Sequence, residues 1–265
     1  MTARAIGGDR GRSWAIGLWG VALCAIASAR PCSSLLAQSI ADRVAQAPDG
    51  RVLMSFTAKP GVCGHGRNIS TQWHSDEWEP WCEPGPVRVV LRVEGRRVMS
   101  LTTHLGGRWR ASAEGTDLGE VPAAMAAEYF LTLAERETGR VGKDAILAAV
   151  LADSAEVWPR LLAIARNESR PREVRKGAVF WLGQAAGEAA AEGLTQLATD
   201  SGDVDVREHA VFALSQLPRD QGVTHLIAIA RTHADPRIRK KAIFWLGQSE
   251  DPRALALFEE LLTRL

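Results

Sequence analysis

Residues 174–182 read VRKGAVFWL, residues 206–214 read VREHAVFAL, and residues 238–246 read IRKKAIFWL. The three segments align without gaps, and each begins 32 residues after the one before it. In the segment before each of these, apolar residues recur every 32 residues at two positions, which form two columns. The first column is Leu162, Leu194, Leu226 and Phe258, and the second is Ala165, Leu197, Ile229 and Leu261. Two helical segments per period, repeated at a constant step, are typical of a helical solenoid.

Each quoted segment has the pattern of an amphipathic helix. Its first, fifth and ninth residues are apolar in all three copies, so they fall on one stripe, and the small alanine in the middle allows close helix pairing. One helix pair cannot bury its apolar faces alone, so neighbouring pairs must stack. The second position is always arginine and follows an acidic or proline-containing loop. This pattern predicts an Asp–Arg ladder formed by Arg175, Arg207 and Arg239 with Asp203, Asp205 and Asp235.

The loop and helix at residues 235–242, which read DPRIRKKA, resemble the HEAT-repeat family. The short period is similar to that of bacterial HEAT-like repeats related to the phycobilin-lyase repeats. The resemblance covers about residues 140–265 and implies an α-α superhelix that serves as a protein-binding scaffold. The lyase activity of those relatives is not implied, because nothing in the chain matches a chromophore site.

The first 37 residues have the features of a secretory signal peptide. Three of the first twelve residues are arginine, and they precede an uncharged stretch over residues 14–29. This stretch is shorter than the roughly 20 apolar residues of a membrane-spanning helix. Cleavage after Ala37 is preferred to cleavage after Ala29, and an uncleaved N-terminal anchor is the alternative. The chain is therefore predicted to be periplasmic or secreted, with no stable membrane span after cleavage.

Between the leader and the repeats the pattern is that of β-structure. Residues 52–57 predict a strand, and residues 87–93 and 97–103 predict a hairpin around the Glu94-Gly95 turn. We therefore expect a mainly α fold, with a C-terminal α-α superhelix and a small N-terminal β-rich domain. The predicted organisation is a signal peptide at residues 1–37, a β-rich disulfide-bearing domain at residues 38–118 and HEAT-like repeats at residues 119–265.

Cleavage of the leader removes two of the four cysteines and leaves Cys63 and Cys82. In an exported protein such a pair most simply forms a disulfide. The alternative is a zinc site formed by the two cysteines with His65 and His74, although their spacing matches no zinc module that we can justify. Three tryptophans in the same loop either order it over the sheet or line a ligand-binding surface: Trp73, Trp78 and Trp81.

Composition and motifs argue against several classes of function. The chain carries 32 basic and 31 acidic residues, a balance that does not fit an electrostatic nucleic-acid binder. It contains no Gly-x-Ser-x-Gly elbow, no His-Glu-x-x-His pair and no phosphate loop. A Cys63 nucleophile with a histidine base is conceivable, but a disulfide would consume its thiol. We therefore predict no enzymatic activity, no cofactor and no metal site.

The candidate binding surface is the concave face of the solenoid, which the second helices of such repeats line. Three columns with the repeat step predict an aromatic centre with polar flanks on this face. They consist of Lys176, Phe180, Gln184, Glu208, Phe212, Gln216, Lys240, Phe244 and Gln248. The alternative, which we favour for the phenylalanines, is that each one packs between adjacent repeats; Trp181 and Trp245 are assigned to packing.

The predicted function is that of an exported, non-enzymatic interaction scaffold whose partner is a protein or peptide. The alternative function is that of a sensory or regulatory module with a small-ligand site in the tryptophan-rich loop. The two hypotheses differ in the part of the chain that binds: the concave face in the first and the loop around Cys63 and Cys82 in the second.

Overall fold

The structure is a computed structural model that describes residues 38–71, 82–107, 115–184, 188–218 and 221–263. Residues 38–265 form one compact unit. The predicted signal peptide and its cleavage site lie outside the described residues, as do His74 and the three tryptophans of the loop. Within the part of the chain that the structure describes, no helix combines the length and the apolar character needed to cross a membrane.

The N-terminal part is built around a four-stranded sheet with strand order β5-β4-β1-β6. Its strands are β1 (Gly50–Phe56), β4 (Val87–Glu94), β5 (Arg97–His104) and β6 (Thr116–Glu120). The predicted β4–β5 hairpin is confirmed: the strands pair antiparallel, with Leu91 opposite Leu101. Strand β6 pairs parallel to β1 on the other edge. Alternate residues of β4 are buried, so one face of the sheet belongs to the core.

A short hairpin carries Cys63, and a disulfide joins it to Cys82 further along the chain. Strands β2 (Cys63–His65) and β3 (Asn68–Ser70) form a short antiparallel hairpin. The predicted disulfide is confirmed, because Cys63 and Cys82 are bonded with their Cα atoms 5.1 Å apart. Beside it, Gly64 and Glu83 exchange two backbone hydrogen bonds of 2.9 and 3.0 Å. The covalent bond and this bridge together hold the chain after the hairpin against β2.

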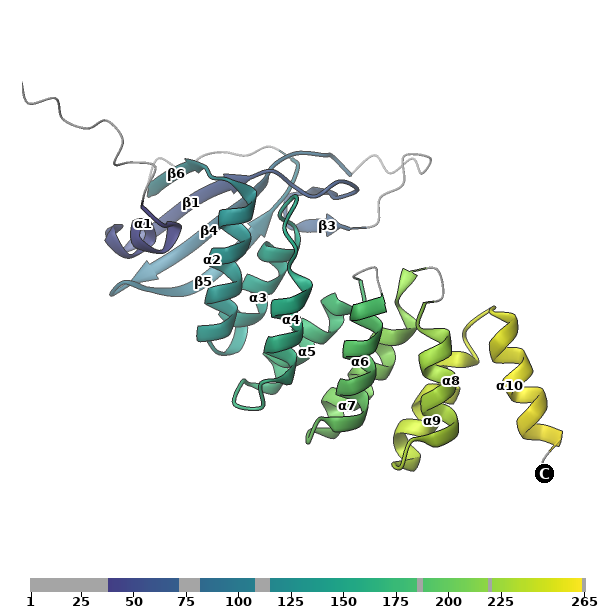
Figure 1. Ribbon diagram of the computed structural model, residues 1–265. Helices are drawn as coiled ribbons and strands as arrows, with labels where there is room; N and C mark the ends of the chain where they lie inside the picture. The colour runs from purple at the N-terminus through teal and green to yellow at the C-terminus, as the bar shows by residue number, and fades with distance from the viewer. Residues whose placement is uncertain (1–37, 72–81, 108–114, 185–187, 219–220, 264–265) are drawn as a thin grey trace, which may run out of the picture. The chain divides into compact units, whose positions relative to one another are not determined.

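The remainder of the described chain is helical (Figure 1). A short helix α1 (Ile40–Gln46) precedes the sheet. The other helices are α2 (Ala123–Arg136), α3 (Gly139–Val150), α4 (Trp158–Arg166), α5 (Arg172–Leu182), α6 (Glu188–Asp200), α7 (Val204–Ser215), α8 (Val223–Thr232), α9 (Pro236–Leu246) and α10 (Pro252–Thr263). The first helices α4, α6, α8 and α10 form one layer, and the second helices α5, α7 and α9 continue a second layer that begins with α3. The predicted mainly α fold with a helical array is confirmed.

The predicted apolar stripe of the second helices forms the centre of the array. Its nine residues are all buried: Val174, Ala178, Leu182, Val206, Ala210, Leu214, Ile238, Ala242 and Leu246. The columns of the first helices are buried through α8. At α10, however, Leu261 is exposed and Phe258 is only half-buried, because no described helix packs beyond α10.

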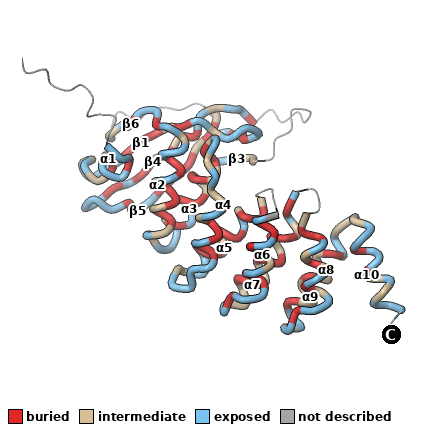
Figure 2. The backbone as a smooth tube through the Cα atoms, in the orientation of Figure 1, coloured by how far each residue is buried: buried red, intermediate tan, exposed pale blue. Residues whose placement is uncertain are grey.

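One hydrophobic core runs from the sheet into the helices (Figure 2). Phe56 on β1 packs against Phe130 on α2, with ring centroids 6.0 Å apart. The backbone is joined as well, since the N–H of Lys59 donates to the carbonyl of Leu151 at 2.8 Å and the N–H of Asp153 donates to that of Thr57 at 3.0 Å. Helix α3 therefore has two roles: it contacts strand β5 and also packs against α5.

Candidate functional site

A buried arginine fixes the orientation of the second helices. The side chain of Arg175 on α5 is only 4% exposed. Its Nε donates to the carbonyl of Ala165 in the last turn of α4 at 3.0 Å, and its Nη2 donates to Ser201 Oγ, just beyond α6, at 3.0 Å. The last carbonyls of a helix lack partners within the helix, so this guanidinium satisfies one of them while joining three helices.

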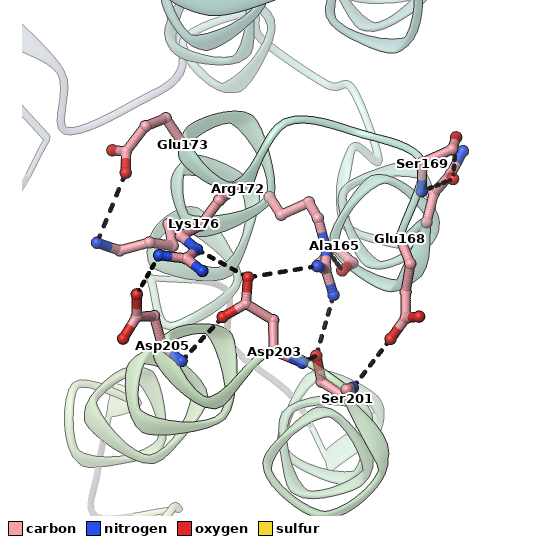
Figure 3. Close-up of polar contacts among 12 residues, drawn as sticks. Ala165, Glu168, Ser169, Arg172, Glu173, Lys176, Ser201, Asp203 and Asp205 are labelled. Atoms are coloured by element: carbon pink, nitrogen blue, oxygen red, sulfur yellow. Dashed lines mark hydrogen bonds and ion pairs between the residues drawn. The ribbon is translucent and has the colours of Figure 1, made fainter.

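Asp203 completes the junction (Figure 3). As the N-cap of α7, it accepts from the N–H of Asp205 at 3.0 Å, and it also accepts from Arg172 Nε at 2.8 Å. Arg175 Nη1 lies 3.9 Å from the same carboxylate. Desolvation opposes the charge of Asp203, but the Arg172 and Asp205 hydrogen bonds prevail and hold its pKa below the usual value.

Two of the three arginines of the predicted Asp–Arg ladder lie beside an aspartate of the next repeat. Arg175 lies 3.9 Å from Asp203, and Arg207 lies 3.4 Å from Asp235. Arg239 instead donates to the backbone carbonyls of His233 and Ala234 at 2.6 and 3.0 Å. Arg172 shows no periodic pattern, because the equivalent positions in the next two repeats are Val204 and Pro236.

The layer of second helices lies on the inner side of the curved stack. Successive second helices, α3, α5, α7 and α9, contact one another much more extensively than the first helices α4, α6, α8 and α10 do. In a curved two-layer array the helices of the inner layer are closer together. We call the exposed surface of α3, α5, α7 and α9 the second-helix face.

The aromatic column of the second-helix face is partly open to solvent. Phe180 is 38% exposed and Phe244 is 54% exposed, so the expectation that they pack between repeats is wrong. Phe212 is half-buried, with its ring 5.0 Å from that of Trp245 and 5.6 Å from that of His209. Packing between repeats therefore describes Phe212 alone. The difference comes from the residue that the next second helix places beside each ring. Trp245 of α9 covers Phe212, whereas the equivalent residue of α7, beside Phe180, is the small Ala213.

The polar columns flank these rings. Lys176, Gln184 and Glu208 are half-buried, whereas Gln216, Lys240 and Gln248 are exposed. Glu208 forms an ion pair of 3.5 Å with Lys241 on the next second helix. Lys176 lies 4.0 Å from Glu173 on its own helix. Lys240 forms no ion pair with any described residue, so its charge is available to a partner.

A cleft of about 420 Å³ opens on the second-helix face between α3, α5 and α7. Its lining includes Lys143 and Leu147 from α3, Lys176 and Phe180 from α5, and His209 from α7. The cleft is open because Gly177 occupies a position that carries a histidine and a lysine in the next two repeats. This cleft was not predicted from the sequence. Its signal was the residue at one repeat position, which is Gly177 in the first repeat but the large side chains His209 and Lys241 in the next two.

The cleft contains both basic and acidic side chains. Burial lowers the pKa of His209, and the positive charges of Lys176 and Lys143 lower it further against the opposing effect of Glu173. Burial raises the pKa of Asp144, which also lines the cleft, although Arg140, Lys143 and Arg67 oppose that shift. Two lysines, Lys143 and Lys176, and two carboxylates, Asp144 and Glu173, line the cleft, so its formal charges balance.

Replacing Gly177 with alanine is expected to stabilise the protein by about 0.5–1 kcal/mol, because glycine in a helix interior costs that much in backbone entropy. The added Cβ would meet Lys143 Cγ at 3.5 Å and Ile146 Cδ1 at 3.7 Å, which are ordinary contacts. Urea denaturation measures the change. Gly142→Ala is the matched control and is expected to destabilise, because its Cβ would lie 2.7 Å from the carbonyl oxygen of Glu137. If the two substitutions change the free energy of unfolding equally, Gly177 does not have the free space around it that an open cleft requires.

The loop with the cysteines offers no free thiolate. The disulfide consumes both thiols that a Cys63 nucleophile or a zinc site would need. His65 lies 3.5 Å from the carboxylate of Glu83, and His74 lies outside the described residues. Among the residues that the structure describes, no three histidine, cysteine, aspartate or glutamate side chains form a group that could hold a metal ion.

Paired helices stacked in two layers are the architecture of the α-solenoid repeat proteins. Two overlapping segments, residues 158–232 and 191–264, match the family model of HEAT repeats, so residues 158–264 of this chain are HEAT repeats. The family resemblance inferred from the sequence is thereby confirmed, while the relation to phycobilin-lyase repeats stays a prediction. No curated protein matches the chain. HEAT repeats are commonly protein-interaction scaffolds and are generally non-enzymatic.

Proposed function

We propose that this protein is an exported, non-enzymatic scaffold that binds a protein or peptide on its second-helix face. The observation that carries the proposal is the exposure of Phe180 and Phe244 at the same position of two repeats. Exposed aromatic side chains on a rigid surface gain free energy when a partner covers them, and such residues commonly dominate protein interfaces. The half-buried Phe212 lies between them in the sequence of repeats and continues the column.

The exported part of the proposal rests on the leader and on the disulfide. The arginines and the uncharged stretch of residues 1–37 have the order of a signal peptide. A disulfide between Cys63 and Cys82 is suited to an oxidising compartment, such as the periplasm or the extracellular space. The small-ligand alternative has only sequence support, because the three tryptophans of the loop lie outside the described residues.

A cross-linked pull-down from the cells that make the protein tests the proposal. The bait is the full-length chain with a C-terminal tag, and a second bait carries Phe180→Ala, Phe212→Ala and Phe244→Ala. We expect the unmodified bait to capture a protein partner and the triple variant to lose at least about nine-tenths of it, as removal of interface aromatic anchors does. Mass spectrometry of the same bait is expected to find Gln38 at its N-terminus.

A matched control removes exposed apolar side chains elsewhere. Met99 on β5, Met125 on α2 and Leu255 on α10 are all exposed and lie outside the second-helix face. A bait with these three residues changed to alanine is expected to keep the partner. Equal loss with both triple variants, or capture that is indifferent to the phenylalanines in a folded bait, would reject the second-helix face as the binding surface.

A further inference from the structure

Positive charge is concentrated at one end of the second-helix face, on α9. The 11 residues of α9 include four basic side chains and no acidic one. The basic residues are Arg237, Arg239, Lys240 and Lys241. On α7, by contrast, the positions equivalent to Arg237 and Lys240 carry carboxylates, and the charges that line the cleft at the other end of the face balance. The cationic part of the face is therefore α9.

The carboxylates of the neighbouring elements are already bound by other basic side chains. The three pairs are Asp205 with Arg172 at 2.6 Å, Glu208 with Lys241 at 3.5 Å, and Asp251 with Arg253 at 2.6 Å. Glu250 follows the C-terminal end of α9, whereas Arg237 and Lys240 lie in its N-terminal half. These carboxylates therefore leave the charge of Lys240 and Arg237 uncompensated.

One carboxylate serves two arginines at the start of α9. Asp235 is the N-cap of the helix and accepts from the backbone N–H of Arg237 at 2.9 Å. Its Oδ1 lies 3.7 Å from Arg237 Nε, and its Oδ2 lies 3.4 Å from Arg207 Nη2. Lys240 forms no ion pair with any described residue. After the ion pairs are counted, α9 thus keeps an excess of positive charge, which is complementary to negative charge on a partner.

The uncompensated charges lie on the same side of α9 as its exposed aromatic ring. Arg237, Lys240 and Phe244 follow one another at steps of three and four residues, so they share one face of the helix. All three are exposed, and Phe244 is the most exposed aromatic residue of the column, at 54%. Its ring lies 5.0 Å from that of Trp245, which supports it from the side of the array. A partner that covers Phe244 therefore also approaches both cationic groups.

Resting on the proposed function, we infer that the partner is an acidic protein segment that binds on α9. Its carboxylates lie beside Arg237 and Lys240, and one of its apolar side chains covers Phe244. Burial of the ring contributes free energy, while the carboxylates supply the counter-charge that the chain itself does not provide there. The rest of the segment follows the aromatic column toward Phe212 and Phe180, where the charges balance, so the charge of α9 fixes its direction along the face.

Fluorescence anisotropy with defined peptides tests the chemistry of the partner. The labelled probes are short peptides with one central leucine, flanked by glutamate, by serine or by lysine. We expect the full-length protein to bind the glutamate-flanked peptide about tenfold or more tightly than the serine-flanked one at low salt. Raising the ionic strength should reduce this difference, because salt screens exposed charges.

Two matched charge reversals test the location. Lys240→Glu changes an exposed lysine of α9, and Lys143→Glu changes an exposed lysine of α3 that likewise forms no ion pair with a described residue. At about 0.15 M salt the Debye length is about 8 Å, and packed helices are about 8–10 Å apart, so a charge on α3 lies well beyond one Debye length from α9. We expect Lys240→Glu to weaken binding of the glutamate-flanked peptide about fivefold or more and to improve binding of the lysine-flanked one. Lys143→Glu should change neither, and thermal unfolding verifies that both variants are folded.

Several outcomes would overturn the inference. These are equal binding of the glutamate- and serine-flanked peptides, no binding of any peptide, or equal effects of the two charge reversals. Binding to phosphatidylglycerol vesicles that Lys240→Glu abolishes, without binding of the peptides, would assign α9 to a membrane surface instead.

A Lys240→Glu bait in the pull-down separates this inference from the proposed function. If this bait keeps a partner that the triple phenylalanine variant loses, the second-helix face binds its partner but the charge of α9 does not select it. If the unmodified bait captures no partner while the peptides bind as expected, the chemistry of α9 stands and the scaffold function does not.

Discussion

Changing Arg175 to alanine is expected to lower the free energy of unfolding by about 3 kcal/mol. The substitution removes the donor to the Ala165 carbonyl and to Ser201 Oγ, and it leaves both acceptors buried without that partner. It also removes a positive charge 3.9 Å from Asp203 and empties the space of a large side chain that is almost fully buried. The α4, α5 and α6 junction depends on all of these contacts. Equilibrium urea denaturation followed by far-UV circular dichroism measures the loss.

Arg239→Ala is the matched control for this prediction. Arg239 occupies the same position one helix pair beyond Arg207 and is half-buried. Among the described residues, it donates to two backbone carbonyls of the loop before α9 and to no carboxylate. Its loss should cost about 1 kcal/mol. If Arg175→Ala lowers the free energy of unfolding no more than Arg239→Ala does, burial of the guanidinium does not stabilise the junction. The Asp–Arg ladder would then contribute as little as surface ion pairs do.

The second large effect is expected from the double variant Cys63→Ser, Cys82→Ser. A disulfide that closes a loop with a sequence separation of 19 residues restricts the unfolded chain, and its removal should cost about 3 kcal/mol. Both cysteines are buried, so two hydroxyl groups in their place add a desolvation cost. The loss is measured as the free energy of unfolding in urea, with the midpoint and the slope both fitted, because removal of the cross-link expands the unfolded chain and changes the slope.

Reduction of the unmodified protein provides the control. A reducing agent should lower its stability to that of the double variant, while the double variant should not respond to the agent. A reduced protein as stable as the oxidised one would show that the β2–β3 hairpin and the Gly64–Glu83 bridge hold this segment without the covalent bond.

The two predictions concern separate parts of the molecule. The disulfide stabilises the β2–β3 segment, whereas the Arg175–Asp203 junction sets the register between successive helix pairs. A scaffold requires the second kind of stability in particular, because the aromatic residues of the second-helix face form a column only if the repeats keep a constant rotation. Variants at Arg175 that still fold are therefore expected to bind a partner less tightly even though Arg175 itself is buried.

Several elements of the fold were not predictable from the sequence. Helix α1 has only seven residues, too few for a reliable period. Strand β6 reads TDLGE, which shows no apolar alternation, and it exists because β1 offers it a parallel edge. Because its pairing partner is distant in the sequence, the five residues of β6 show no strand pattern of their own. The hairpin of β4 and β5, by contrast, is local and carries both alternation and a turn, so it was predicted with its bounds correct to within one residue.

The architecture of the array is readable from the amino-acid sequence alone. The constant step of 32 residues, the apolar stripe of Val174, Ala178 and Leu182, and the Asp–Arg pattern all follow from interactions that repeat along the chain. The binding surface, in contrast, depends on how neighbouring helices pack. Phe180 and Phe212 stand at the same repeat position, but Trp245 covers one and Ala213 leaves the other open. The exposure of a side chain and the cleft at Gly177 depend on side chains contributed by neighbouring helices, and a periodic pattern cannot show what a neighbour leaves empty.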